Sequence, residues 1–316
     1  MKITVLDAAT LGEDISLERF CEIGDTTIYQ MTPQECVQER VKDCDVIIVN
    51  KVKLNESNLE KAANLKLICI TATGYDNVDV AYCKSKNIAV CNVKGYSTDS
   101  VSQVTVATVL SLYNYLPVYD KFVKDGSYTA SGVQNCLTPV YHEIAGKTWG
   151  IVGLGNIGMQ VAKVAKALEC NVIAYKRNKI DEIKCVSLSE LMSTSDIITI
   201  HLPLSDSTKN IIDKDMISLM KPTAVIVNAA RGAVWDEHCI AEAILEGKIG
   251  AMGCDVYSIE PMELDHPFMK LIDKDNVCLL PHMAWGSFEA RNRCLDEITL
   301  NIKSFFDGKI RNRVDI

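Results

Sequence analysis

The sequence lacks an excess of positive charge. Its 33 Lys and Arg residues are outnumbered by 41 Asp and Glu residues, which gives a formal net charge of −8 at pH 7. A basic surface field that would attract nucleic acid or anionic lipid is therefore not expected. A small anionic ligand would need a cation placed locally at its binding site.

Paired Cys-x-x-Cys motifs are also lacking. The chain has 13 cysteines, an odd number, and Cys69, Cys254 and Cys278 lie inside apolar runs typical of strands. This usage indicates buried thiols in a reducing, cytoplasmic environment and favours neither a disulfide framework nor a metal site. The opening residues, 1–7, predict a short strand rather than a signal peptide.

An uninterrupted apolar run able to cross a membrane is lacking as well. Residues 101–119 carry no charge, but six polar side chains and Pro117 interrupt them. We interpret this run as a buried helix from about residue 100 to 116. Residues 119–144 show few helix signals, and loops of that length are usually functional or form an interface. We expect them to be the arm of a homodimer.

What the sequence does contain is a glycine loop between a strand and a helix. Apolar residues 149–152 predict a strand that runs directly into Gly153-Leu-Gly155-Asn-Ile-Gly158 and a helical pattern. Gly153 would allow a tight turn, Gly155 would let a pyrophosphate approach the backbone, and Gly158 would let helix and strand pack closely. The amides at the helix start would then face the phosphates. In this context the loop predicts a dinucleotide site rather than an ordinary turn.

Apolar strands alternate with helices on both sides of the loop. We predict strands at 3–6, 45–50, 65–71, 88–92, 149–152, 171–175, 197–201, 224–228, 249–254 and 277–280. This pattern is typical of an α/β protein with two doubly wound parallel sheets. We expect a flavodoxin-like substrate domain, residues 1–98 plus 288–316, and a Rossmann-type dinucleotide-binding domain, residues 99–287, with the active site in the cleft between them. The first domain is discontinuous because the helix from Ser287 is expected to return to it.

Three residues with catalytic chemistry follow three successive strands of the second domain. Arg231 comes after 224–228, Glu260 after 249–254 and His282 after 277–280. Doubly wound folds place their sites beyond the carboxyl ends of strands, so these side chains can converge. An Arg suits a carboxylate or carbonyl oxygen, a His suits proton transfer, and a carboxylate can orient the His. Considered by itself, Glu260 is better interpreted as a solvated surface residue than as a catalytic one.

A fourth segment could bind an anion. Thr73 and Gly74 follow the strand at 65–71. Small residues at the carboxyl end of a parallel strand can aim backbone amides at an anion, although an ordinary strand-to-helix turn has the same composition.

Taken together, these segments resemble the D-isomer-specific 2-hydroxyacid dehydrogenases over nearly the whole chain. The matching segments are Ala72–Asp79, Gly153–Gly158, His201–Leu204, Asn228–Asp236, Gly253–Val256, Glu260-Pro261 with Asp265–Pro267, and Pro281-His282. Residues 50–52 and 281–285 are most similar to the glycerate dehydrogenase (hydroxypyruvate reductase) branch.

The resemblance implies reduction of a 2-oxo acid to a D-2-hydroxy acid by hydride from NAD(P)H. His282 would supply the proton, Glu260 would hold His282, and Arg231 would bind the carbonyl oxygen and the carboxylate. The implied cofactor-binding residues are Gly153, Gly155, Asn156, Ile157, Gly158, Lys176, Arg177, His201, Leu202, Pro203, Ala229, Arg231, Asp255 and His282. The implied substrate-binding residues are Thr73, Gly74, Arg231, His282, Lys51 and Trp285.

Two positions depart from the family pattern. NAD-preferring members usually carry an acidic residue where Lys176 stands. Lys176 and Arg177 would instead attract the 2′-phosphate of NADPH, so we expect a preference for NADPH, although a solvated basic turn would look the same. Gln103-Val104 also replace a common acidic residue and His, which leaves the Arg231, Glu260 and His282 set unchanged.

The sequence specifies the substrate less closely than it specifies the reaction. Trp285 would limit bulk and Lys51 could meet a hydroxyl or an anion, which favours hydroxypyruvate or glyoxylate, although both residues could equally serve packing or the surface. A bulkier acid of the 2-oxoisocaproate or phenylpyruvate type is the alternative. Phosphoglycerate dehydrogenase is disfavoured because no phosphate cluster is evident and the chain ends at residue 316. Formate dehydrogenase is disfavoured because the resemblance implies a partner other than Glu260 for the histidine in that enzyme. A dinucleotide-sensing, corepressor-like interaction protein remains a different class of function.

Overall fold

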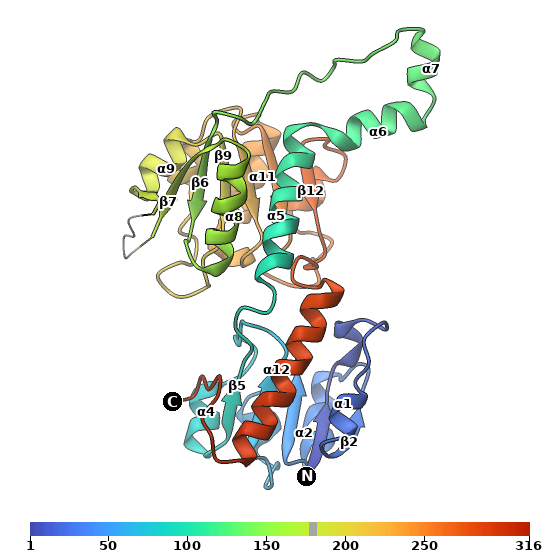
Figure 1. The fold of residues 1–316 in the computed structure, drawn as a ribbon, viewed down its shortest axis with the longest axis vertical. Helices are drawn as coiled ribbons and strands as arrows, with labels where there is room; N and C mark the ends of the chain where they lie inside the picture. The colour runs from blue at the N-terminus through green and yellow to red at the C-terminus, as the bar shows by residue number, and fades with distance from the viewer. Residues whose placement is uncertain (177–181) are drawn as a thin grey trace. The chain divides into compact units, whose positions relative to one another are not determined.

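The computed structural model describes residues 1–176 and 182–316 and divides into two compact units (Figure 1). Residues 1–97 and 286–316 form the first unit, and residues 98–285 form the second. Within the described residues, no helix is long and apolar enough to span a membrane.

The first unit is built on a five-stranded, all-parallel sheet. Its strands lie in the order β2-β1-β3-β4-β5, which is the flavodoxin-like order. Their bounds are β1 Lys2–Val5, β2 Asp25–Ile28, β3 Val46–Val49, β4 Leu67–Ile70 and β5 Ala89–Cys91. β3 and β4 are buried along their whole length, as expected of strands covered on both faces.

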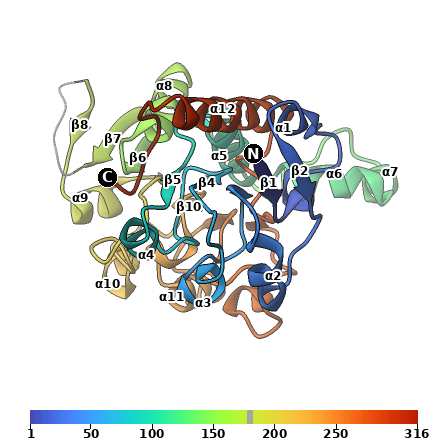
Figure 2. The same ribbon diagram turned by 90° about the horizontal axis from the view of Figure 1, so that it is seen from below.

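Helices cover both faces of this sheet. Their bounds are α1 Glu18–Cys21, α2 Val37–Val41, α3 Glu56–Leu59, α4 Val80–Ser85 and α12 Phe288–Phe306. Figure 2 shows α12 on one face of the sheet and α2 and α3 on the other. Ser287 caps α12 by accepting a hydrogen bond from the Ala290 amide, and Ile298 and Ile302 on this helix are fully buried. One face of the sheet is therefore covered by the last helix of the chain.

The second unit is built on a seven-stranded parallel sheet in the order β12-β11-β10-β9-β6-β7-β8. The strands are β6 Thr148–Val152, β7 Asn171–Tyr175, β8 Lys184–Cys185, β9 Ile197–Ile200, β10 Val225–Asn228, β11 Ala251–Cys254 and β12 Val277–Leu279. Numbered from β6, this is the Rossmann order with one added strand, and the direction of winding reverses between β6 and β9. A doubly wound fold binds its ligand at that reversal.

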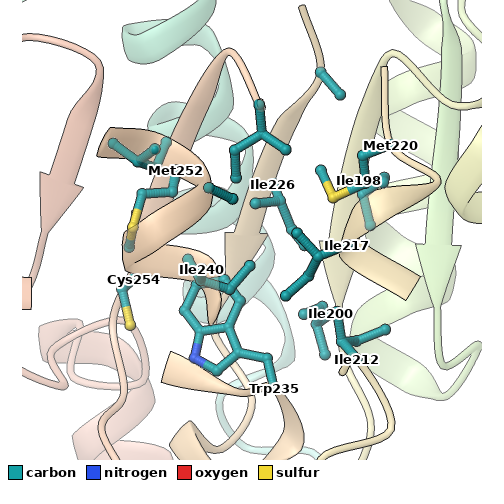
Figure 3. Close-up of a cluster of buried hydrophobic side chains, with 14 of the residues drawn as sticks. Ile198, Ile200, Ile212, Ile217, Met220, Ile226, Trp235, Ile240, Met252 and Cys254 are labelled. Atoms are coloured by element: carbon teal, nitrogen blue, oxygen red, sulfur yellow. The ribbon is translucent and has the colours of Figure 1, made fainter. Parts of the chain in front are cut away.

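Helices pack on both faces of the second sheet as well (Figure 1). Their bounds are α5 Thr98–Tyr113, α8 Asn156–Ala167, α9 Leu188–Thr194, α10 Lys214–Ser218 and α11 Glu237–Leu245. α5 and α8 share one apolar core with the sheet, and α9, α10 and α11 share the other. Figure 3 shows that second core, where the indole of Trp235 lies among isoleucines from strands and helices.

The segment that follows α5 differs from its sequence-based prediction. The predicted helix ends at Tyr113, three residues early, and Tyr115 takes a left-handed conformation (φ 51°). Residues 119–144 are not irregular throughout, because α6 (Leu116–Lys124) and α7 (Ser127–Ser131) occupy their first part. Neither helix buries a residue, but α6 is amphipathic, with Leu116, Tyr119 and Val123 at helical spacing, and this signal was overlooked in the sequence.

Candidate active site

The glycine loop lies at the point where the second sheet reverses its winding. It follows β6, and the next strand across the reversal, β9, ends at Ile200. The His201 amide donates to the Val152 carbonyl at 2.7 Å, which joins the two strand ends. A Cβ added at Gly153, where φ is +100°, would lie 2.8 Å from the His201 carbonyl carbon. The chain turns here at a position that only glycine accepts without strain.

The three glycines meet different surroundings. A Cβ at Gly158 would lie 2.2 Å from the Gly153 carbonyl oxygen, so helix and loop are in direct backbone contact. A Cβ at Gly155 would meet nothing within 4 Å, so its open side is available to a ligand. α8 begins directly after Gly155, and the first amides of a helix have no acceptor within the helix. An open backbone at a helix start fits the pyrophosphate of a dinucleotide.

His201 adds a second indication of a ligand at this reversal. Both of its ring nitrogens are buried and neither has a hydrogen-bond partner. Burial lowers the pKa of this imidazole to about 3. The residue as a whole is only half-buried, but both of its ring nitrogens are buried. The pKa is lowered because the added proton would place a positive charge on these buried atoms. Buried polar atoms without partners are rare in folded proteins, so a ligand group is a reasonable partner for them.

The low pKa of His201 makes stability depend on pH. The unfolded chain binds a proton at this residue below about 6.5, whereas the folded protein binds it only near 3. Folding stability should therefore fall by up to about 1.4 kcal/mol per pH unit as pH decreases between these values. Denaturant titrations of wild type and His201→Asn at several pH values should show a steeper loss in wild type. Parallel pH profiles would contradict this assignment.

Glu260 and His282 form a close pair at the ends of neighbouring strands. His282 Nδ1 lies 2.6 Å from Glu260 Oε2, and both side chains are partly exposed. The other carboxylate oxygen of Glu260 accepts the Tyr257 amide at 3.0 Å, which fixes the carboxylate in the loop after β11. With Nδ1 engaged by the carboxylate, Nε2 is the ring atom left to exchange a proton with a ligand. An imidazole held by a carboxylate in this way can exchange a proton with a ligand.

Asp255 holds the backbone that carries His282. Its carboxylate accepts the Met283 amide at 2.8 Å and the Ala284 amide at 3.0 Å, and burial raises its pKa. These bonds fix the two residues after His282, whose φ of +53° is uncommon for a residue with a side chain. Strained backbone of this kind gathers at functional sites. The role of Asp255 in orienting the nicotinamide stays a prediction, and the structure shows this backbone contact, which the sequence did not predict.

Arg231 follows β10, and its loop packs against the loop that carries Glu260. A Cβ at Gly232 would lie 2.1 Å from the Tyr257 carbonyl carbon and 2.2 Å from the Ser258 nitrogen. Arg231 itself donates to the Ala230 carbonyl at 2.7 Å, and its own carbonyl accepts from Asn228. The structure thus brings the backbone segments of Arg231 and Glu260 together, and the contact between Glu260 and His282 adds the third candidate catalytic residue.

The remaining candidate cofactor residues lie on the same unit. Leu202 approaches Gly153, the Pro203 carbonyl accepts from Thr208, and Ala229 is half-buried at the end of β10. Lys176 is half-buried at the end of β7, whereas Arg177 lies outside the described residues. Trp285 is half-buried after the His282 loop. Among the residues that the structure describes, no group of three or more His, Cys, Asp or Glu side chains could hold a metal ion.

The candidate substrate residues Thr73, Gly74 and Lys51 lie on the first unit. Thr73 Oγ1 donates to the Val93 carbonyl at 2.8 Å, so its hydroxyl is used within the loop after β4. Lys51 is exposed, and its backbone amide donates to buried Asp7 at 2.6 Å.

Asp7 is a residue that the sequence analysis missed. Its carboxylate accepts the amides of three successive residues, 50–52, and so fixes the loop that carries Lys51. An acidic residue directly after the first apolar strand is the only signal that the sequence offers for this contact.

The fold and the site are those of an NAD(P)-binding oxidoreductase: a Rossmann-type sheet with a fitting glycine loop and a carboxylate–histidine pair at neighbouring strand ends. Residues 106–284 match the family model described as the NAD binding domain of D-isomer specific 2-hydroxyacid dehydrogenases. Two full-length relatives are similar over the whole chain. A hydroxypyruvate reductase of Blautia hydrogenotrophica is 33% identical and covers 100% of both chains. A glycerate dehydrogenase of Methylorubrum extorquens is 34% identical and covers 99% of both.

Among solved structures, D-lactate dehydrogenase from Aquifex aeolicus, complexed with NAD and lactic acid, has a TM-score of 0.87 at 29% identity, covering 100% of this chain and 99% of its own. The chain therefore belongs to the D-isomer-specific 2-hydroxyacid dehydrogenase family, in its glycerate dehydrogenase and hydroxypyruvate reductase branch. It is an NAD(P)-dependent D-2-hydroxyacid dehydrogenase.

Proposed function

We propose that this enzyme reduces hydroxypyruvate or glyoxylate to the D-2-hydroxy acid, with His282 as the proton donor and NADPH as the favoured hydride donor. The observation that carries the proposal is the 2.6 Å contact between His282 Nδ1 and Glu260. It leaves Nε2 as the atom that gives a proton to the substrate oxygen, and takes it back in the reverse direction. The nicotinamide supplies the hydride when it is bound.

The remaining residues bind and orient in this proposal. Arg231 holds the substrate carboxylate and polarises the carbonyl, which makes the carbonyl carbon more electrophilic. The Thr73 and Gly74 amides bind the carboxylate as well. Asp255 and the Ala229 carbonyl orient the carboxamide, and the segment from His201 to Pro203 lies beside the nicotinamide ribose. The partnerless nitrogens of His201 support the last assignment.

The substrate assignment rests on two candidate pocket residues. Trp285 limits the size of the acid, and Lys51 meets its hydroxyl or anionic group. The names of the full-length relatives support the same class of acid. Absorbance loss of NADPH and of NADH should be followed with hydroxypyruvate, glyoxylate, pyruvate, 2-oxoisocaproate and phenylpyruvate. The proposal expects the first two to be reduced most efficiently, and faster turnover of phenylpyruvate than of hydroxypyruvate would overturn it.

Absence of turnover with all five acids would lead to a different conclusion. If the folded protein binds nucleotide but reduces none of the five acids, the dinucleotide-sensing alternative is favoured instead. Isothermal titration with NADPH and NADH on the same preparation separates a nucleotide-binding protein without turnover from a preparation that is simply inactive.

The cofactor preference is expected to depend on Lys176. A basic residue at the end of β7 attracts the 2′-phosphate of NADPH, whereas a carboxylate there would bond the ribose hydroxyl and repel the phosphate. Replacing Lys176 with Asp should lower the ratio of kcat/KM for NADPH to that for NADH by at least about tenfold. Lys163→Asp, on α8, provides a control with the same charge change. A wild-type enzyme that clearly prefers NADH would count against the assignment.

We further propose that the second unit forms a homodimer through the segment from α6 to Ile144. Figure 1 shows this segment extending away from the sheet of its own unit. It exposes six large apolar side chains: Leu116, Val123, Val133, Leu137, Val140 and Tyr141. Exposed apolar residues gathered on one segment are typical of an interface.

The oligomeric state tests this proposal directly. Wild type should sediment as a dimer of the 34.9 kDa chain. Leu137→Asp combined with Val140→Asp should raise the dimer dissociation constant by at least about 100-fold, because two charges would be buried at the interface. Ile310→Asp, at an exposed apolar residue of the other unit, serves as the control. A monomeric wild type at micromolar concentration would reject the homodimer.

A further inference from the structure

A second carboxylate–histidine pair lies behind the Glu260 loop. Glu237 Oε2 and His266 Nε2 are 3.1 Å apart, and only 10% and 7% of these side chains are exposed. Glu237 stands in the first turn of α11, where an exposed acidic residue would already be favourable. Here, however, its carboxylate is turned inward. Its other oxygen accepts the Ser258 amide at 2.9 Å, two residues before Glu260.

The contacts of His266 fix its orientation. Its Nδ1 accepts the Phe268 amide at 3.2 Å, so Nδ1 carries the lone pair and the ring proton lies on Nε2, facing Glu237. The Nε2 and Oε2 atoms lie 3.1 Å apart without satisfying hydrogen-bond geometry. His266 also packs edge-on against Tyr257, with ring centroids 5.7 Å apart. Glu237 therefore links Ser258 at one end of the Glu260 loop to His266 at the other.

The same loop makes the contacts that place the catalytic pair. The Tyr257 amide fixes Oε1 of Glu260, and the Tyr257 hydroxyl donates to the Leu280 carbonyl at 2.9 Å, two residues before His282. A displacement of residues 257–258 would therefore alter Glu260 and His282 together. Gly232 packs against the same two residues from the Arg231 side. Residues 257–258 are the common support of all three candidate catalytic segments.

We propose that Glu237 and His266 form a positioning pair that holds the Glu260 loop so that Glu260 stays aligned with His282. This inference rests on the proposed function for its kinetic consequence. Neither residue contacts the reacting groups, and each acts through Ser258, Tyr257 and Glu260. Loss of the pair leaves the substrate carboxylate and the nucleotide bound as before but misaligns the proton donor, so it lowers kcat rather than raising KM.

Glu237→Gln is the sharpest variant, because it keeps the size of the side chain. A glutamine has one acceptor oxygen, but Glu237 faces two donors, the Ser258 amide and His266 Nε2–H. Either orientation of the amide opposes a donor to a donor, so the link is broken on one side. Glu242→Gln makes the same chemical change at an exposed residue of the same helix and serves as the control. We expect Glu237→Gln to lower kcat for hydroxypyruvate by about tenfold with KM and nucleotide affinity within about twofold of wild type.

Two variants of His266 separate positioning from stability. His266→Asn can still accept the Phe268 amide but cannot reach Glu237, whereas His266→Gln can offer a donor to Glu237 but loses the contact with Phe268. Positioning predicts that His266→Gln retains more of the wild-type kcat than His266→Asn. A merely structural role predicts the reverse order, because the Phe268 contact caps the following 3-10 helix, Pro267–Leu271.

A spectroscopic measurement makes the test independent of turnover. The ring proton of a short His–carboxylate bond resonates far downfield in proton NMR, and the chain has only five histidines to assign. The His282 resonance should be lost in Glu260→Gln, shifted in Glu237→Gln and unchanged in Glu242→Gln. An unmoved resonance together with an unchanged kcat in Glu237→Gln overturns the positioning pair. If wild type reduces no 2-oxo acid, the proposed function fails, and the resonance still decides the positioning.

Discussion

Replacement of His282 by alanine is expected to lower kcat for hydroxypyruvate by about 10³-fold, within the range of 10² to 10⁴ that general acid catalysis contributes. The physical reason is that the variant removes the proposed proton donor, the imidazole whose Nδ1 lies 2.6 Å from the Glu260 carboxylate. Hydride transfer would then place negative charge on an oxygen without a proton donor. Stopped-flow oxidation of NADPH at saturating substrate measures the loss.

Two further variants make this result interpretable. His282→Asn should lose activity to the same degree, although asparagine tolerates the left-handed backbone (φ +53°) that His282 adopts. Agreement between the two variants would separate loss of the imidazole from a change in the backbone. His238→Ala, at an exposed histidine on α11, should keep wild-type kcat. Retention of more than a tenth of kcat in both His282 variants would reject His282 as the proton donor.

The second large effect is expected at the glycine loop. Gly155→Ala should weaken NADPH binding by about 100-fold, because the added methyl group keeps the pyrophosphate from the helix-start amides and removes one or two charge-assisted hydrogen bonds of about 1.5–3 kcal/mol each. The thermal midpoint of the protein without nucleotide should not change, since a Cβ at Gly155 meets nothing within 4 Å and its φ is negative. Isothermal titration and calorimetry measure the two quantities.

Gly158→Ala provides the contrast. Its Cβ would lie 2.2 Å from the Gly153 carbonyl oxygen, so α8 or the loop must shift. Overpacking of this kind costs about 1–3 kcal/mol of stability, so this variant should lose both thermal midpoint and nucleotide affinity. If Gly155→Ala binds NADPH as wild type does, the pyrophosphate does not pass over Gly155 and the predicted mode of binding is wrong.

The parts of the fold that the sequence predicted correctly are those with a local physical signature. β3 and β4 are continuous apolar runs because both of their faces are covered, and the glycine loop joins a strand to a helix within a few residues. Arg231, Glu260 and His282 could be grouped because strand ends of a parallel sheet lie along one edge. Their roles, and the role of Lys176, remain predictions.

The parts that were missed depend on contacts between distant segments. β2 and β8 are edge strands without a continuous buried run, and β8 has only two residues. Glu237 and His266 are 29 positions apart, and nothing in their local sequence indicates that each is turned inward. Asp7 and Asp255 likewise act on backbone amides more than 25 positions away, which no pattern of side chains reveals. Sequence periodicity reports the face that a residue occupies, but not its partner.

The position of α12 on the first unit has a consequence for synthesis on the ribosome. Residues 1–97 emerge first, but the helix that covers one face of their sheet, Phe288–Phe306, emerges only after all of residues 98–285. The early strands therefore wait with an apolar face exposed while the later unit, which is continuous in sequence, can complete its own core. We expect ribosome-bound chains from which residues 1–285 have fully emerged to show a protease-resistant second unit and a protease-sensitive first one. A chaperone that shields apolar surface would act during this interval.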